Sequence, residues 1–212
     1  MLRYQTIPVT PFQQNCSLVW CDQTQEAAVI DPGGDLPRIR AAANGLGLVL
    51  KQILLTHAHI DHAGGTGTLA RELKLPIVGP HPGDQYWIDG LAQQAQMFGF
   101  APAEPFTPTR WLKDGDSVQV GRSTLAVLHC PGHTPGHVVF HSAEASRAFV
   151  GDVLFAGSIG RTDFPGGDHE TLLASIRNKL WPLGDDTVFI PGHGPESSFA
   201  RERRHNPYVQ DR

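Results

Sequence analysis

The 212-residue sequence has few cysteines, no long hydrophobic run and no excess of basic residues. Its three cysteines, Cys16, Cys21 and Cys130, fit neither a disulfide scaffold nor a paired-cysteine zinc or redox site. The N-terminal residues lack the apolar core of a signal peptide, and no segment reaches the roughly 18 apolar residues that a membrane span needs. We therefore expect a cytoplasmic protein without a membrane partner.

Positive charge is also scarce, with 17 Lys and Arg against 21 Asp and Glu and a net charge of −4. No overall basic field would attract a nucleic acid, so we expect no such partner. The hydrophobic content of 40% and charged content of 18% are ordinary for a soluble enzyme. No repeat and no linker divides the chain, which predicts a single domain over residues 1–212. The sequence leaves the oligomeric state open.

Several familiar catalytic motifs are missing. The pair His169-Glu170 lacks the second histidine of HExxH, and the glycines after His62 are not followed by the Lys-Ser/Thr of a phosphate-binding loop. No GxSxG motif is found either. These absences argue against phosphate-loop and serine-hydrolase chemistry.

Hydrophobic periodicity predicts two blocks of strands, each followed by helices. The expected strands cover residues 4–9, 17–21, 27–30, 52–55 and 77–78 in the first block, and 118–120, 125–127, 138–141, 148–150 and 187–190 in the second. The expected helices cover residues 35–46, 66–73, 84–98, 170–180 and 197–204. Such an order predicts an α/β fold with two sheets packed face to face and helices outside.

Residues 80–110 read as an insertion, because turn signals at both ends enclose the helix expected over 84–98. This helix carries several large apolar residues, among them Tyr86, Trp87 and Met97. Two roles remain open for it: a helix packed on the edge of a sheet, or an apolar wall or lid beside a pocket.

The segment THAHIDH, residues 56–62, places three histidines and an aspartate within six positions. His57 and His59 are two positions apart, so they share a face in an extended chain but not on a helix. Asp61 and His62 are adjacent and must diverge, which allows them to serve a second ion. Four crowded ionisable groups would destabilise one another without a cation, and we therefore predict a metal site.

Three later stretches offer further metal ligands, each after an aliphatic strand and beside a glycine. They are LHCPGHTPGH with His133, FVGDVLF with Asp152, and FIPGHGP with His193. Imidazole and carboxylate ligands without a thiolate suit zinc, iron or manganese. We interpret His81, His141, His169 and His205 as surface or hydrogen-bonded core residues instead.

This set of motifs resembles the metallo-β-lactamase superfamily over almost the whole chain. The resemblance implies a four-layer αββα sandwich with two mixed β-sheets and two divalent metal ions along one edge. It assigns His57, His59 and His133 to the first ion and Asp61, His62 and His193 to the second, with Asp152 bridging them. It also makes Asp31 the buried aspartate that orients the histidine loop. Aspartate stands at 152 where the best-known β-lactamases place cysteine, which argues against antibiotic hydrolysis.

Within the superfamily the sequence is most similar to the glyoxalase II enzymes, the hydroxyacylglutathione hydrolases, and especially to their short bacterial type. The similarity lies in QNCSLVWC, LHCPGHTPGHVVF, GRTDFPGGDH and FIPGHGP. It implies that Arg161 contacts the glutathione carboxylates. Only about 20 residues follow His193, so we expect no C-terminal helical glutathione-binding domain.

The resemblance implies hydrolysis of a small-molecule thioester, S-lactoylglutathione or a related glutathione-derived compound, by a hydroxide that bridges the two metals. Asp61 would accept the proton of the attacking water, and zinc is the expected metal, with iron or manganese as alternatives. Three other functions stay open: a persulfide dioxygenase with a single iron, an RNase Z-like phosphodiesterase, and a metal-binding module without catalysis. The PGHGP motif favours the hydrolase over the dioxygenase.

Overall fold

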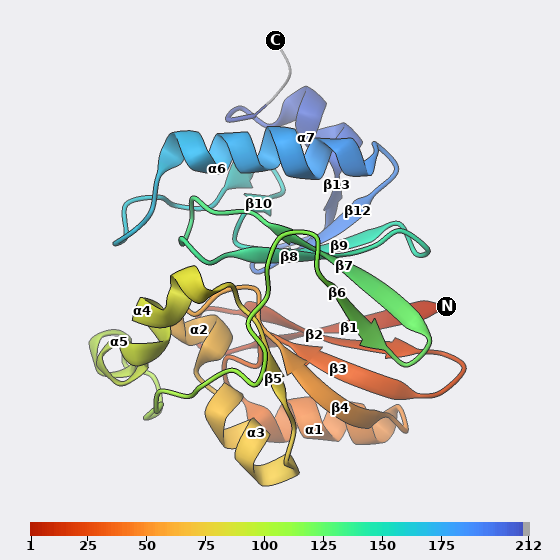
Figure 1. Cartoon of the computed structure of the whole chain (residues 1–212), viewed down its shortest axis with the longest axis vertical. Helices are drawn as coiled ribbons and strands as arrows, with labels where there is room; N and C mark the ends of the chain where they lie inside the picture. The colour runs from red at the N-terminus through yellow and green to blue at the C-terminus, as the bar shows by residue number, and fades with distance from the viewer. Residues whose placement is uncertain (210–212) are drawn as a thin grey trace.

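Two β-sheets pack face to face in the computed structural model, which describes residues 1–209, and helices cover the outer face of each sheet (Figure 1). The first sheet has five strands in the order β1-β2-β3-β4-β5, and the second has six in the order β13-β12-β9-β8-β7-β6. Both sheets are mixed, because β3 pairs with β4, β4 with β5 and β9 with β12 in parallel while the other pairs are antiparallel. The predicted four-layer αββα sandwich is confirmed.

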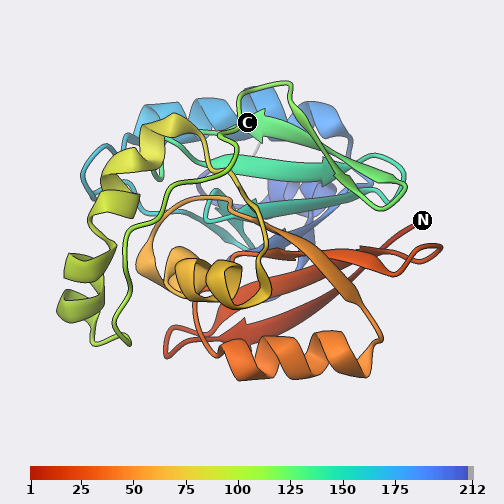
Figure 2. The ribbon, with the colours of Figure 1, turned by 60° about the horizontal axis from the view of Figure 1, so that its bottom comes forward.

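The N-terminal half of the chain forms the first sheet and the helices beneath it. The strands are β1 (Leu2–Val9), β2 (Gln14–Cys21), β3 (Glu26–Ile30), β4 (Val49–Leu54) and β5 (Ile77–Val78). Helices α1 (Leu36–Gly45) and α3 (Thr66–Leu73) lie on the outer face of this sheet, and Figure 2 brings them forward. Ile39 of α1 and Leu69 of α3 are fully buried against it.

The C-terminal half forms the second sheet and the helices above it. The strands are β6 (Ser117–Val120), β7 (Ser123–His129), β8 (Val138–Ser142), β9 (Arg147–Gly151), β12 (Val188–Pro191) and β13 (Ser197–Ser198), with a small separate hairpin of β10 (Leu154–Phe155) and β11 (Ser158–Ile159). Helix α6 (His169–Ser175) runs into the π-helical turn Ile176–Leu180 and the 3-10 turn Trp181–Leu183, and α7 (Phe199–His205) follows β13. In Figure 1 these helices form the top layer.

The central core lies between the two sheets. Valine and leucine alternate with exposed residues along β6 and β7, so that Val118, Val120, Leu125 and Val127 point inward and are buried. They pack with residues of the first sheet such as Leu54. This alternation confirms the predicted hairpin and explains why the two sheets associate through these faces.

The helix expected over 84–98 is not continuous. It is divided into the 3-10 turn η1 (Pro82–Asp84), α4 (Gln85–Asp89) and α5 (Leu91–Phe98), with Gly90 between the two α-helices. Glycine is a poor helix former and permits this change of direction. None of the helices in residues 1–209 combines the length and the apolar character that crossing a membrane requires.

Candidate metal centre

Seven side chains meet at one edge of the sandwich, where strands of both sheets end. Residues 57–62 follow β4 and include the short helix α2 (Ile60–Ala63), which the sequence did not predict. His133 follows β7, Asp152 follows β9, and His193 follows β12. The structure thus brings together every predicted metal ligand, and we call the set the His–Asp cluster: His57, His59, Asp61, His62, His133, Asp152 and His193.

Of three groups of closely spaced donor atoms, one joins Asp31 to His57 and His62, and the other two lie on either side of Asp152. Ligand atoms of His57, His59 and His133 lie within 4.8 Å of one another, and so do those of Asp61, His62 and His193. His133 Nε2 is 3.0 Å from His59 Nδ1, and His193 Nε2 is 3.0 Å from Asp61 Oδ2. These are the two ligand sets that the sequence resemblance implied.

The carboxylate of Asp152 reaches both groups. Its Oδ1 lies 3.3 Å from His62 Nε2, and its Oδ2 lies 3.7 Å from His133 Nε2 and 3.6 Å from His193 Nε2. Gly192 makes this approach possible, because a Cβ at that position would overlap Asp152 Oδ1. Asp152 therefore occupies the position expected of a ligand shared by two ions.

Asp31 fixes the protons of two histidines. Thr56 donates its hydroxyl proton to Asp31 Oδ2 at 2.6 Å, so the Thr56 oxygen is left to accept from His57 Nδ1 at 3.0 Å. His62 Nδ1 donates to the same Asp31 oxygen at 2.8 Å. In both rings the proton is therefore on Nδ1, and the Nε2 lone pair is free to bind a metal.

Backbone carbonyls do the same for two more histidines. His133 Nδ1 donates to the carbonyl of Arg161 at 2.8 Å, and His193 Nδ1 donates to that of Phe12 at 3.1 Å. The His193 loop is further held by Asn15, whose backbone N–H donates to the carbonyl of Gly192 at 2.7 Å. Each ring is thus held in one orientation with its Nε2 directed into the cluster.

The cluster contains buried polar atoms that no residue among 1–209 satisfies. These atoms are the Nε2 of His57, His59 and His62 and the Oδ1 of Asp152. Burial lowers the pKa of His57 and His59 well below the usual value, so both imidazoles are neutral, which is the form that binds metals. Unpartnered imidazole nitrogens beside buried carboxylates are the donor set that a divalent transition metal requires, so the residues fit such ions.

The electrostatic environment at His62 favours positive charge. Burial acts to lower the pKa of His62, but the Asp152 and Asp61 carboxylates outweigh it and raise the pKa well above its usual value. The same neighbours act on Asp152: burial would raise its pKa, but His62, His133 and His193 lower it below the ordinary range. A bound cation would satisfy both carboxylates at this point.

Two buried polar residues of the 80–110 segment hold the cluster from outside, and sequence analysis missed both. Asp84 accepts from the Ala58 N–H at 2.9 Å, the Gly136 N–H at 2.6 Å and the Thr134 hydroxyl at 3.0 Å. It thereby joins the loop of His57 and His59 to the loop of His133. Burial raises the pKa of Asp84 to about 6, although these three donors favour its charged form.

Gln94 on α5 completes the contact with the histidine loop. Its Oε1 accepts from the Ile60 N–H at 3.0 Å, and its Nε2 donates to the carbonyl of Trp87 at 2.8 Å. Trp87 in turn packs edge-on against the ring of His59, with centroids 4.4 Å apart. The 80–110 segment is therefore both a packed support of the cluster and, as shown below, a wall of the adjoining cavity.

His137 is a further buried histidine that sequence analysis did not assign to the site. Its Nε2 accepts from the backbone N–H of Asp152 at 3.1 Å, and its ring stacks on that of His57 with centroids 4.6 Å apart. It lies in the repeated PGH of residues 131–137, which was the available signal. His137 positions two members of the cluster without joining it.

A cavity of about 840 Å³ opens onto the His–Asp cluster. Its floor includes His59, Asp61, His133, Asp152 and His193. Its rim includes four large apolar residues that we call the outer wall: Phe12 between β1 and β2, Tyr86 on α4, and Met97 and Phe98 on α5. Of the two roles left open for the 80–110 segment, the apolar wall beside a pocket is present.

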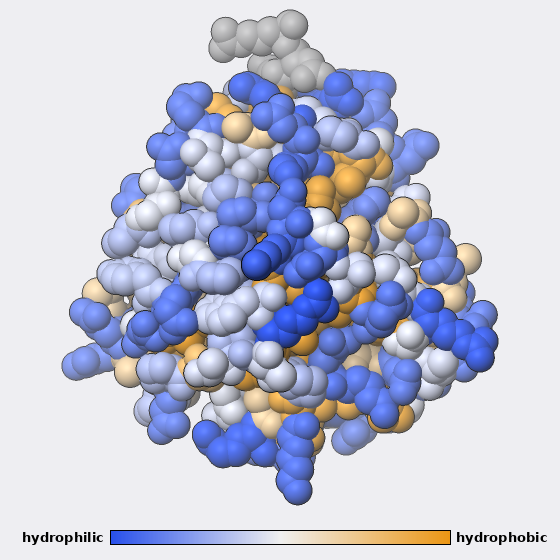
Figure 3. Space-filling model, in the orientation of Figure 1, coloured by the Kyte–Doolittle hydropathy of each residue, from blue (hydrophilic) through white to orange (hydrophobic). Residues whose placement is uncertain are grey.

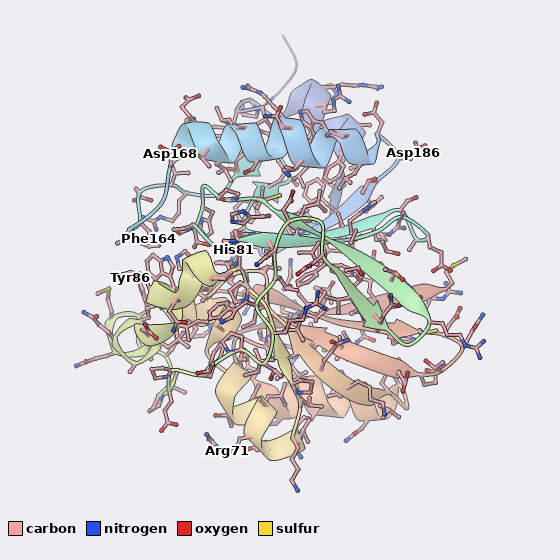
Figure 4. All side chains as sticks on the ribbon, in the orientation of Figure 1. Arg71, His81, Tyr86, Phe164, Asp168 and Asp186 are labelled. Atoms are coloured by element: carbon pink, nitrogen blue, oxygen red, sulfur yellow. The ribbon has the colours of Figure 1, made fainter. Side chains whose placement is uncertain are left out.

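Arg161 also lines this cavity, but most of its guanidinium is engaged within the chain. Its Nε and Nη2 donate to the two oxygens of Asp163 at 2.7 and 2.6 Å, and its Cζ lies 4.0 Å from the centre of the Phe164 ring. Figure 4 shows Phe164 at the same edge of the molecule as Tyr86. Arg161 is thus placed to meet a ligand, with only part of its donor capacity free.

Comparisons with known proteins agree with this arrangement. The profile of the metallo-beta-lactamase superfamily matches residues 9–193. The chain is 45% identical to hydroxyacylglutathione hydrolase GloC of Haemophilus influenzae, with full coverage of both chains. It is also 35% identical to human mitochondrial persulfide dioxygenase ETHE1, over 87% of this chain and 67% of that protein.

Two solved structures are very similar to this fold. The B3 metallo-beta-lactamase BLEG-1 superposes with a TM-score of 0.90 and 36% identity, over 99% of this chain and all of that one. TTHA1623, solved in a di-iron-bound form, superposes with a TM-score of 0.88 and 38% identity, over 97% of this chain and all of that one.

Proposed function

The chain belongs to the metallo-β-lactamase superfamily, and from this we propose that it is a metal-dependent hydrolase of thioesters, with S-lactoylglutathione or a related hydroxyacyl thioester as the expected substrate. The observation that carries the proposal is the His–Asp cluster at the floor of a cavity, with the protons of four of its five histidines fixed so that their Nε2 atoms face inward. Full-length similarity to a hydroxyacylglutathione hydrolase supports the thioester substrate.

His57, His59 and His133 would hold one ion, Asp61, His62 and His193 the other, and Asp152 would contact both. When bound, divalent ions supply a water that loses its proton near neutral pH and polarise the carbonyl group of the substrate. We propose zinc as the metal, and iron is the first alternative because TTHA1623 was solved with two irons.

In the reaction the water oxygen bonds to the carbonyl carbon, the carbon–sulfur bond breaks, and the products are a carboxylic acid and a thiol. Asp61 lies at the cavity floor, 3.0 Å from His193, and we assign its carboxylate the task of accepting the water proton. Asp31 has a positioning role, because it holds His62 directly and His57 through Thr56.

Further parts of the proposal concern the substrate and the setting. Arg161 would meet a carboxylate of the thiol portion with its remaining donors. The chain would act as one domain in the cytoplasm.

Persulfide dioxygenase activity is the main alternative, because ETHE1 is 35% identical to this chain. It would require one iron and oxygen in place of two ions and water. Beta-lactam hydrolysis belongs in the same panel, because BLEG-1 is described as a metallo-beta-lactamase.

The test is to purify the protein without added metal, count its ions, and compare three assays: S-lactoylglutathione hydrolysis, oxygen uptake with glutathione persulfide, and hydrolysis of a chromogenic cephalosporin. We expect two ions per chain and thioester hydrolysis, which His62→Ala should abolish. Oxygen uptake with a single iron, or hydrolysis that survives His62→Ala unchanged, would overturn the proposal.

A further inference from the structure

The outer wall is unusual because its large apolar side chains are exposed. Eight large hydrophobic residues are exposed among residues 1–209, and four of them form this wall: Phe12 (46%), Tyr86 (63%), Met97 (68%) and Phe98 (39%). The face in Figure 3 is mainly hydrophilic, as is normal for a soluble protein. A concentration of such residues on one cavity therefore indicates a binding surface.

The apolar lining continues from the outer wall toward the His–Asp cluster. Trp87, Phe164 and Pro165 also line the cavity, and the rings of Trp87 and Phe164 both contact His59, with centroids 4.4 and 5.4 Å away. A ligand bound at the cluster therefore lies beside aromatic surface. Because cluster and wall line one cavity, a molecule bound at the cluster can extend onto the wall.

Positive charge contributes little to this cavity. Apart from the histidines of the cluster, Arg161 is the one basic residue among those that line it, all of which lie in the described part of the chain. Two of its donors already bind Asp163. Glutathione carries two carboxylates, so ion pairing within this cavity can account for only part of its recognition.

We propose that the cavity selects thioesters that carry an extended apolar group, an aromatic ring or a chain of several carbons, on one side of the thioester bond. The outer wall, which includes Met97 and Phe98 of α5, binds this group. The inference rests on the proposed thioester hydrolase function and defines its substrate class. Each methylene that becomes fully buried should raise affinity about fourfold.

The experiment uses the metal-loaded enzyme and two pairs of substrates, so that either side of the thioester can carry the apolar group. One pair keeps glutathione and compares a lactoyl with a mandeloyl group. The other keeps the lactoyl group and compares N-acetylcysteamine with 2-phenylethanethiol. Each kcat/KM is divided by the rate of hydrolysis by hydroxide alone. We expect the phenyl-containing member of at least one pair to be preferred tenfold or more.

Three variants test whether the apolar group of the substrate binds at the outer wall. Met97→Gln and Phe98→Gln should each reduce the preference at least threefold, chiefly through KM. Leu46→Gln is the matched control, because Leu46 is as exposed as Phe98, at 38%, but lies after α1 and outside the cavity. It should leave the preference unchanged.

The outcomes separate the inference from the proposed function. If all four thioesters are hydrolysed with a preference below threefold in both pairs, the inference is wrong and the function stands. If none is hydrolysed, the proposed function is wrong, and the inference is then tested by ligand binding. Calorimetry should find that the protein binds S-benzylglutathione at least tenfold more tightly than S-methylglutathione. Equal affinities would overturn it.

Discussion

The floor and the outer wall of the cavity are built in opposite ways. On the floor, four of the five histidines of the two ligand groups are buried and His193 is 29% exposed, and four of their Nδ1 atoms have a fixed acceptor. On the wall, Tyr86 and Met97 are mostly exposed. Side chains on the floor are therefore held in position by burial and by hydrogen bonds, whereas side chains on the wall have few contacts that hold them.

This difference separates two requirements of a metal-dependent enzyme. Metal ligands must be held in nearly fixed positions, which needs outer hydrogen bonds such as those of Asp31 and Asp84. A surface that receives an apolar group needs exposed area instead, and its side chains can change without disturbing the fold. We expect substitutions on the floor and on the wall to differ accordingly.

The largest effect should come from Asp152→Asn. The carboxylate lies within 3.7 Å of three histidines, and the change removes its charge while preserving its size. We expect kcat/KM to fall by more than the roughly 100-fold that loss of an outer partner causes, with fewer ions bound per chain. Asp186→Asn, at the exposed position labelled in Figure 4, is the control. Full activity and metal content in Asp152→Asn would contradict the shared-ligand role.

Metal removal should lower stability without unfolding the sandwich. Ions that bind the folded chain stabilise it by about 2.7 kcal/mol when their free concentration is 100 times Kd. The hydrophobic core between the sheets contains no residue of the cluster. We therefore expect a chelator to lower the melting temperature while circular dichroism retains the sheet signal. Loss of that signal on chelation would show that the metals are required for folding.

Asp84→Asn tests whether the 80–110 segment supports the floor. The two oxygens of Asp84 accept from different backbone N–H groups, those of Ala58 and Gly136. The side-chain amide of asparagine has only one oxygen, so one of these two N–H groups would face the NH₂ group and lose its acceptor. An unsatisfied buried donor costs about 1–3 kcal/mol of unfolding free energy, and we also expect metal affinity to fall about 10- to 100-fold. Urea denaturation and competition with a chelator measure the two effects.

The control for this change is Asp89→Asn, which alters an exposed carboxylate of the same segment. It should change the unfolding free energy by no more than about 0.5 kcal/mol. If Asp84→Asn behaves in the same way, the support is not important for the cluster.

The smallest effect on stability should come from the outer wall. Met97→Gln replaces a side chain that is 68% exposed with another good helix former. We expect urea denaturation to show a change of no more than about 0.5 kcal/mol in the unfolding free energy. A loss above 1 kcal/mol would mean that the wall is part of the fold, and the contrast with the floor would disappear.

The sequence predicted the parts of this structure that have a local signal. Alternation along residues 118–127 indicated the hairpin, and the helix expected at about residues 66–73 is α3 (Thr66–Leu73). For the His–Asp cluster, the signal was an ionisable residue beside a glycine at the end of an aliphatic strand. This pattern selected His133, Asp152 and His193, and the crowding of ionisable residues in THAHIDH selected the other four.

The supports of the cluster had no such signal. Asp84 acts on residues 26, 50 and 52 positions away, and Gln94 acts on Ile60, 34 positions away. Both lie in a segment whose pattern indicates only amphipathic helix, and their partners are mostly backbone groups that any residue would present. The break at Gly90 did have a signal in the glycine itself, but helical periodicity on both sides outweighed it.

The contacts between Asn15 and the loop of His193 have a consequence for biosynthesis. A ribosome makes the strands that receive this loop long before it makes the loop, and domains begin to fold while the remainder is still being made. The first sheet can thus form when the only metal ligands already made are those that follow β4. Metal capture at the complete site must follow translation of residue 193, so a chain that stalls earlier would leave the ribosome without its full set of metal ligands.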